Sequence, residues 1–367
     1  MAAAPDVVIV GGGVIGAACA RELARSGRRI RLVERGGEAG EAWRASAGLL
    51  SPQIDARRED PLFELGIGGR EYWREQAPAL RESTGIDVGL VESGILETAH
   101  DDHAVHRLKE AVAWQRQHGH TAEWLDPDEV RREWPWLGDT SGGLHAAQDG
   151  SLDPARAVEA LRAEAVRLGV EIVGDAVTGI LAGKGRVTGV EGKRRHPASA
   201  VLIAAGAWSG RLERLPRPLS IEPVRGQIAA YAWPEGAKPG AVVGRGAYVL
   251  HRDGEAITGS TMEHAGFVPQ VTPEGLSSIH ERIRLLVPSL ADSKPRRSWA
   301  GFRPGTPDGL PIVGQEPNVE GLWYATGHGR HGVLLAGITA VIITHLMSGE
   351  ATFEEARALR PDRFWSW

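Results

Sequence analysis

The sequence predicts the α/β fold class, with a parallel sheet and an antiparallel sheet in two interleaved domains. Three observations lead to this prediction. Residues 7–34 have the pattern of a strand, a glycine turn, a helix and a second strand. Residues 200–204 form another apolar run that can pair in parallel with the first strand. Residues 223–233 and 242–260 have the character of antiparallel strands.

The first unit has the G-x-G-x-x-G spacing of a dinucleotide-binding turn. The β-branched run Val7–Val10 leads directly into this turn. Gly11 permits the tight turn, Gly13 lets a pyrophosphate approach the backbone, and Gly16 lets the helix pack closely on the strand. The glycines alone are also compatible with an ordinary strand-to-helix turn, so the ordered context decides for a Rossmann-like unit.

The second strand of this unit ends at Glu34, where a ribose hydroxyl needs an acceptor. A carboxylate at this place favours an unphosphorylated ribose, because a 2′-phosphate would be repelled. FAD or NAD is therefore favoured over NADP, and the motif does not choose between these two.

Charge, cysteine content and hydropathy exclude several classes of protein. A net charge of −5 gives no overall attraction to nucleic acid. Cys19 is the single cysteine, which excludes an intrachain disulfide, and its place in the first helix favours a buried packing residue. The start, MAAAP, lacks a signal pattern, and the apolar run Val333–Met347 is shorter than the roughly 20 residues that span a bilayer. We expect a cytoplasmic enzyme without stable membrane association.

Periodicity and capping residues predict the remaining elements. Residues 61–83 indicate a long amphipathic helix interrupted near Gly68-Gly69 and Pro78, and residues 88–98 a hairpin that turns near Ser93-Gly94. Asp126 and Glu129 have capping-box spacing at another helix start. Further helices are expected over residues 103–118, 155–168, 274–286 and from 333 onward, and further strands over residues 170–173, 177–181, 187–191, 297–302 and 322–325.

Histidines are concentrated between residues 100 and 120. No matching arrangement of carboxylates accompanies them, so the sequence predicts no metal site. The histidines concerned are His100, His103, His106, His118 and His120.

Several segments together resemble one family. They are residues 11–34, 45–50 and 201–209, with WAGFRPGTPDGLP from Trp299 and GHGRHG from Gly327. These segments resemble the FAD-dependent amino acid oxidases related to D-amino acid oxidase and monomeric sarcosine oxidase, and most closely the glycine oxidases. The resemblance covers nearly the whole chain, and its C-terminal pair is more specific than the glycine turn. It implies an FAD-binding domain over residues 1–84, 146–217 and 301–367 and a substrate domain over residues 85–145 and 218–300.

The resemblance implies FAD as the cofactor. The glycine turn would receive the pyrophosphate, residues 47–49 would lie against the isoalloxazine, and the last helix would point its N-terminus at the flavin. Cys19 is not at the late position through which sarcosine oxidases attach flavin, so we expect non-covalent FAD. The cofactor-binding residues predicted in this way are Gly11, Gly13, Val14, Ile15, Gly16, Glu34, Arg35, Ala45, Ser46, Ala47, Gly48, Leu49, Val177, Ala205, Gly206, Trp208, Gly329, Arg330, His331, Gly332, Val333 and Leu334.

The same resemblance assigns the substrate pocket. Arg303, in the G-x-R-P segment, would anchor the carboxylate of an amino acid, because a guanidinium matches a carboxylate bidentately. Tyr248 would donate to the same carboxylate, Arg330 would lie beside the flavin, and Met262 would form an apolar wall. A packed strand tyrosine and a core methionine are the structural alternatives.

Two departures from the family pattern bear on these assignments. Gly246 stands where some glycine oxidases carry histidine, which favours a wider pocket for larger amino acids or N-alkyl glycines. Trp43, Arg44 and Ala45 replace the hydroxyl residues common in the flavin loop.

The implied reaction is oxidative deamination of glycine, sarcosine or small D-amino acids. It comprises hydride transfer from the substrate Cα to flavin N5 without an obligatory protein base, hydrolysis of the imine, and reoxidation by O2 to hydrogen peroxide. The glycine oxidases also suggest a role in thiamine biosynthesis and a homo-oligomer, such as a tetramer. The alternatives are a dehydrogenase of the same fold that reduces a quinone or carrier, a tRNA-modifying oxidase, and a plain NAD-binding module. The lack of a basic amphipathic segment and the acidic balance argue against the first two.

Overall fold

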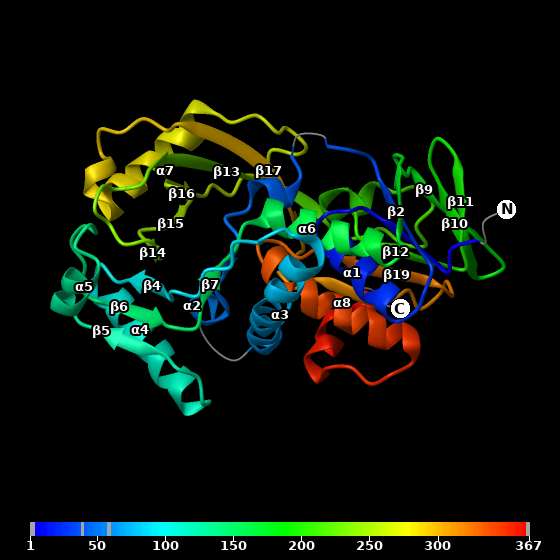
Figure 1. The fold of residues 1–367 in the computed structure, drawn as a ribbon, viewed down its shortest axis with the longest axis horizontal. Helices are drawn as coiled ribbons and strands as arrows, with labels where there is room; N and C mark the ends of the chain where they lie inside the picture. Colours follow the sequence, from blue (N-terminus) through cyan, green and yellow to red (C-terminus); the bar gives the residue numbers. More distant parts are fainter. Residues whose placement is uncertain (1–3, 38–39, 57–59, 365–367) are drawn as a thin grey trace.

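The computed structural model describes residues 4–37, 40–56 and 60–364. Residues 1–3, on which part of the expectation about the N-terminus rests, lie outside these ranges. Figure 1 shows two sheets side by side, one covered by α1, α3, α6 and α8, the other accompanied by α4, α5 and α7. The predicted fold class is confirmed, because one large sheet is mainly parallel and the other mainly antiparallel.

The mainly parallel sheet is built on the predicted first unit. Val8 pairs in parallel with Val201 on one side and Arg31 on the other, so the strand expected at residues 200–204 does return beside the first. The final strand pair is antiparallel. The sheet order is β18 (Ile312–Gln315), β19 (Leu322–Thr326), β12 (Ala200–Ile203), β1 (Val7–Val10), β2 (Ile30–Glu34) and β8 (Glu171–Gly174).

Four helices pack around this sheet and bury its main core. Helix α1 lies between α6 and α8, and Cys19 on α1 is fully buried, as predicted. The helices are α1 (Val14–Arg25), α3 (Pro61–Thr84), α6 (Pro154–Arg167) and α8 (Gly332–Ser348). A small sheet of β9 (Gly179–Gly183), β10 (Arg186–Glu191) and β11 (Arg195–Pro197) packs on the other side.

The second large sheet has eight strands. The strands from β17 to β14 pair antiparallel with their neighbours, and so do β4, β6 and β5. The parallel pair of β14 and β4 connects these two groups. The order is β17 (Arg297–Gly305), β13 (Glu222–Ala232), β16 (Glu255–Gly259), β15 (Ala247–Arg252), β14 (Ala241–Gly244), β4 (Ile95–Thr98), β6 (Gly143–Ala146) and β5 (Glu123–Leu125). The helices that accompany it are α4 (Asp102–Gln117), α5 (Pro127–Glu133) and α7 (Pro273–Leu286).

The capping residues predicted at the start of α5 form the expected hydrogen bonds. Asp126 accepts a hydrogen bond from the Glu129 backbone, and the Glu129 side chain accepts one from the Asp126 backbone, so the predicted capping box is present. Within the ranges that the structure describes, no helix combines the length and apolar character needed to cross a bilayer. The predicted domain division stays a prediction, and its boundary at residues 300/301 falls inside β17.

Helix α3 is continuous, so the interruption predicted near Gly68-Gly69 and Pro78 is wrong. The glycine at position 69 serves packing instead, because a Cβ there would lie 2.2 Å from the carbonyl oxygen of Leu334. Close contact with α8, rather than a break in the helix, explains this glycine.

The hairpin predicted over residues 88–98 is also wrong. Val91 pairs with Ser151, whereas β4 pairs with β6 and β14, so the two halves of the segment have different partners. A third difference concerns β17, which continues through Arg303 to Gly305 instead of ending at residue 302. Arg303 therefore lies on a strand paired with β13.

Candidate active site

The glycine turn forms one wall of a cavity of about 440 Å³. Gly11 has a φ of +99°, and a Cβ there would lie 2.6 Å from the Ala204 carbonyl oxygen. A Cβ on Gly16 would lie 1.8 Å from the Gly11 carbonyl oxygen. The turn, β12 and α1 are therefore as close together as glycine allows, and the N-terminus of α1 faces the cavity.

Glu34 shapes the turn as well as lining the cavity. The Gly12 N–H donates to Glu34 Oε2 at 2.6 Å, and the Gly36 N–H donates to Oε1 at 3.2 Å. Arg162, on α6, donates from Nε to the Gly12 carbonyl oxygen at 2.7 Å. The contribution of Arg162 was not predicted, because it comes from a distant helix.

The far end of this cavity is formed by residues that follow β8 and β12. Val177, Ala205, Gly206 and Trp208 line it, as does the buried Asp175, which the sequence analysis missed. The guanidinium of Arg35 lies 3.7 Å from the centre of the Trp208 ring. These residues give this part of the cavity both apolar and charged walls.

A second cavity, of about 360 Å³, adjoins the first. Its walls include residues 45–49, which run from the last residue of the short helix η1 (Ala42–Ala45) to the first residue of the strand β3 (Leu49–Leu50). Residues 329–334, before and within α8, also line it. The two cavities share Val14, Ala42, Trp43, Gly329 and Gly332 as lining residues. Each predicted site residue except Gly16 lines one of them, and Gly16 lies within α1.

Arg303 enters the second cavity from β17. Its Nη1 donates to the Thr261 carbonyl oxygen at 3.0 Å and its Nη2 to Ser260 Oγ at 2.7 Å. A Cβ on Gly226 would lie 2.1 Å from Nη1, so this glycine of β13 leaves room for the guanidinium. Burial lowers the pKa of Arg303 from its usual value, and the charge of Arg330 lowers it further.

Tyr248 enters the same cavity from β15. It is paired with Gly259 on β16, where a Cβ would lie 2.5 Å from the tyrosine hydroxyl. Burial raises the pKa of Tyr248 to about 12, so the hydroxyl stays protonated at neutral and mildly alkaline pH. Because Gly226 and Gly259 have no side chains, the side chains of Arg303 and Tyr248 can pass over the sheet. This role of the two glycines was not predicted from the sequence.

The mouth of the second cavity carries an ion-paired cluster. Arg330 Nη2 lies 3.1 Å from Asp55 Oδ1, and His331 Nε2 lies 3.6 Å from Asp55 Oδ2. Burial opposes ionisation of Asp55, but His331 and Arg330 hold the pKa of its carboxyl below the usual value. Met262 lies at the rim, where it is 71% exposed, so it is not a core methionine.

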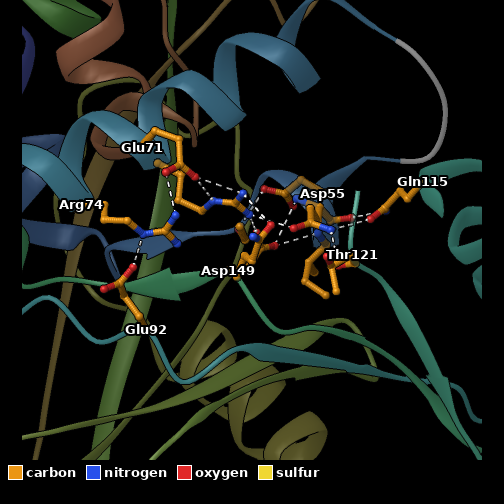
Figure 2. Close-up of polar contacts among 12 residues, drawn as sticks. Asp55, Glu71, Arg74, Glu92, Gln115, Thr121 and Asp149 are labelled. Carbon is orange, nitrogen blue, oxygen red and sulfur yellow. Dashed lines mark hydrogen bonds and ion pairs between the residues drawn. The ribbon is translucent and has the colours of Figure 1, made fainter. Parts of the chain in front are cut away.

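Asp55 ends the short helix α2 (Pro52–Asp55), which a buried polar network holds in place (Figure 2). Asp149 Oδ2 accepts the backbone N–H groups of Gln53 at 3.1 Å and Ile54 at 3.0 Å. Arg70 Nη1 donates to Asp149 Oδ1 and to Gln53 Oε1, both at 2.8 Å. Because Asp149 and Gln53 are fully buried, α2 has little freedom to move.

The paired cavities suit an elongated dinucleotide with a flat ring system. One cavity offers the glycine turn, the helix N-terminus and Glu34, and the other begins at the small residues Ala45, Ala47 and Gly48. A Cβ on Gly48 would lie 2.0 Å from the Leu152 carbonyl oxygen, so the backbone here is tightly packed. These features fit FAD, with its pyrophosphate at the turn and its ring near the small residues.

Comparison with known families agrees with this geometry. The family model described as FAD dependent oxidoreductase matches residues 6–346. The chain belongs to this family. It is therefore an FAD-dependent oxidoreductase, and FAD, the cofactor that the resemblance implied, is its cofactor.

Individual relatives show which members of the family the chain resembles. The glycine oxidase of Pseudomonas aeruginosa is 34% identical over 358 residues, which cover 94% of both chains. The crystal structure of glycine oxidase from Geobacillus kaustophilus matches with a TM-score of 0.93 and 31% identity, over 99% of both chains. The bifunctional protein ThiO/ThiG of Synechocystis sp. is 33% identical over 98% of this chain and 54% of its own length. The predicted similarity to the glycine oxidases is confirmed.

Proposed function

We propose that the protein catalyses oxidative deamination of glycine, sarcosine or a small D-amino acid, with O2 as the electron acceptor. The observation that carries this proposal is the mostly buried guanidinium of Arg303, which enters the second cavity and donates only to neutral oxygens among the described residues. A buried cation of this kind requires an anionic ligand for full compensation. The likeness to glycine oxidases supports an amino acid as the source of that anion.

The roles of the side chains follow from their positions. Arg303 holds the substrate carboxylate bidentately, and Tyr248 donates a hydrogen bond to the same group. This orients the Cα toward the wall formed by residues 45–49, where the flavin ring would lie. Bound FAD would supply the acceptor for the hydride from the Cα, the amine nitrogen would lose one proton, and O2 would receive the two electrons and two protons as hydrogen peroxide. Water then hydrolyses the released imine to an oxo acid and ammonia, or to an oxo acid and a primary amine when the substrate is N-alkylated.

Pocket size and biological context extend the proposal. Gly246 lines the second cavity, and among the described residues a Cβ there would touch only the Arg282 side chain, at 3.6 Å. This open side accommodates substrates larger than glycine. The likeness to a ThiO/ThiG protein supports a role in thiamine biosynthesis. A homo-oligomer remains a prediction.

A panel of amines tests the reaction. We expect glycine, sarcosine or D-alanine to give oxygen uptake, hydrogen peroxide and ammonia or methylamine in equal amounts. L-Alanine serves as the enantiomer control. Reduction of an artificial electron acceptor without peroxide would instead favour a dehydrogenase, and no turnover of any amine would contradict the proposal.

Tyr248→Phe tests the second contact to the carboxylate. Loss of one hydrogen bond to a charged group costs about 1.5 kcal/mol, so we expect KM to rise about tenfold with a small change in kcat. Because burial raises the pKa of Tyr248 to about 12, the wild type should show no titration of this hydroxyl between neutral and mildly alkaline pH. Steady-state kinetics over this pH range check both points, and an unchanged KM would remove Tyr248 from the site.

A further inference from the structure

The second cavity contains an unequal number of positive and negative groups. Its described lining residues include two guanidiniums, Arg303 and Arg330, and one carboxylate, Asp55. Arg330 is paired with Asp55 at 3.1 Å, whereas Arg303 donates to the neutral oxygens of Ser260 and Thr261. Among the arginines and carboxylates of this lining, one positive charge is left for a ligand to compensate.

We propose that Asp55 is a specificity-determining residue that limits the pocket to substrates with a single anionic group. By neutralising Arg330, it leaves Arg303 as the only anion site among the described lining residues. This inference rests on the proposed function, because it assumes that Arg303 binds the substrate carboxylate.

The positions of the two arginines give the reason. Arg303 is mostly buried, whereas the side chain of Arg330 is 57% exposed at the mouth of the cavity. When Arg303 holds the α-carboxylate of a substrate, any second group of that substrate points toward the remaining walls of the cavity. These walls include Arg330 and Asp55. A second carboxylate would meet the negative charge of Asp55 and an arginine that already has a partner, and like charges at close range repel.

Asp55 is well placed to impose this limit because it cannot easily move away. Its side chain is one-quarter exposed and accepts a hydrogen bond from Ser51 Oγ at 3.1 Å. The network of Arg70, Gln53 and Asp149 fixes the backbone of α2 directly before it (Figure 2). The carboxylate is thus held beside Arg330 in the lining of the cavity.

Asp55→Asn removes the charge with little change in shape and releases Arg330. We expect malonate to bind at least about tenfold more tightly relative to acetate than in the wild type, because Arg330 gains an anionic ligand. Binding is measured by titrating the flavin absorption of the FAD-loaded protein, which does not depend on turnover. In kinetics, kcat/KM for D-aspartate relative to D-alanine should rise by a similar factor, mainly through KM.

Matched variants control for indirect effects. Asp253→Asn removes the same charge from an exposed pair with Arg156, whose atoms lie 2.8 Å apart, outside both cavities, and should leave the malonate to acetate ratio unchanged. Asp55→Glu should keep the discrimination. Arg330→Ala in the Asp55→Asn background should abolish the gain, and Arg330→Ala alone should weaken malonate binding further.

The outcomes separate this inference from the proposed function. An unchanged ratio in a folded Asp55→Asn protein overturns the inference even if amines are oxidised. If Asp55→Asn does not fold, tighter malonate binding by Arg330→Ala alone overturns it. If neither acetate nor malonate binds and no amine is oxidised, the carboxylate site itself is wrong and the proposed function fails.

Discussion

Arg303→Ala is expected to lower kcat/KM for the preferred amine by about two to four orders of magnitude while the purified protein remains yellow. Removing one partner of a buried, hydrogen-bonded charge pair costs roughly 3–5 kcal/mol, and each 1.36 kcal/mol corresponds to a factor of ten. The loss should appear mainly as a higher KM, because the guanidinium binds the carboxylate in the ground state and in the transition state. FAD should be retained, because Arg303 lines the second cavity and not the one at the glycine turn.

A matched control lies on the same strand. Arg297, at the start of β17, is exposed and paired with Glu255, outside both cavities. Arg297→Ala should leave KM unchanged within about twofold, because Arg297 does not line either cavity. Its exposed ion pair contributes only about 0–1 kcal/mol to the free energy of unfolding, so the variant should also fold normally. Arg303→Lys should recover part of the affinity, since lysine keeps the charge but not the bidentate geometry. Unchanged kinetics in Arg303→Ala would contradict its role as the carboxylate anchor.

Gly16→Ala is expected to yield a protein that binds FAD at least about tenfold more weakly. The added Cβ would lie 1.8 Å from the Gly11 carbonyl oxygen, so the turn and α1 must separate. Overpacking of this kind costs roughly 1–3 kcal/mol, and here the displaced atoms are those that receive the pyrophosphate. FAD titration of the apoprotein, followed by fluorescence quenching, measures the change.

Gly183→Ala provides the comparison for this variant. Gly183 ends β9, and apart from its chain neighbours no described residue has an atom within 4 Å of a Cβ there. It should bind FAD like the wild type. Wild-type affinity in Gly16→Ala would show that the close approach of α1 to the turn is not needed for cofactor binding.

The sequence predicted the first unit well because its signals are local. The run Val7–Val10, the glycine turn and Glu34 are close in the chain, and each requirement of the turn maps to one residue. The same holds for Asp126 and its capping box. Where glycines served tertiary packing, local reasoning failed, as at Gly69, which allows α8 to approach and does not interrupt α3.

The candidate site could be predicted only in part. Arg303 and Tyr248 were found through family motifs, and both line the second cavity. Asp55 was missed because a single aspartate at the end of the short helix α2 has no local signal, and its importance depends on Arg330 from the other end of the chain. Gly226 and Gly259 were missed for a similar reason, since their role appears only when the strands pair.

The most direct test of the proposed amine oxidation is to mix the purified, FAD-loaded protein with each candidate amine in the absence of O2. The proposed function predicts that glycine, sarcosine or D-alanine bleaches the flavin absorption band, and that readmitted O2 restores it with release of one hydrogen peroxide per flavin. In Arg303→Ala the bleaching should require a far higher amine concentration. A flavin that stays oxidised with each of these amines would contradict the account.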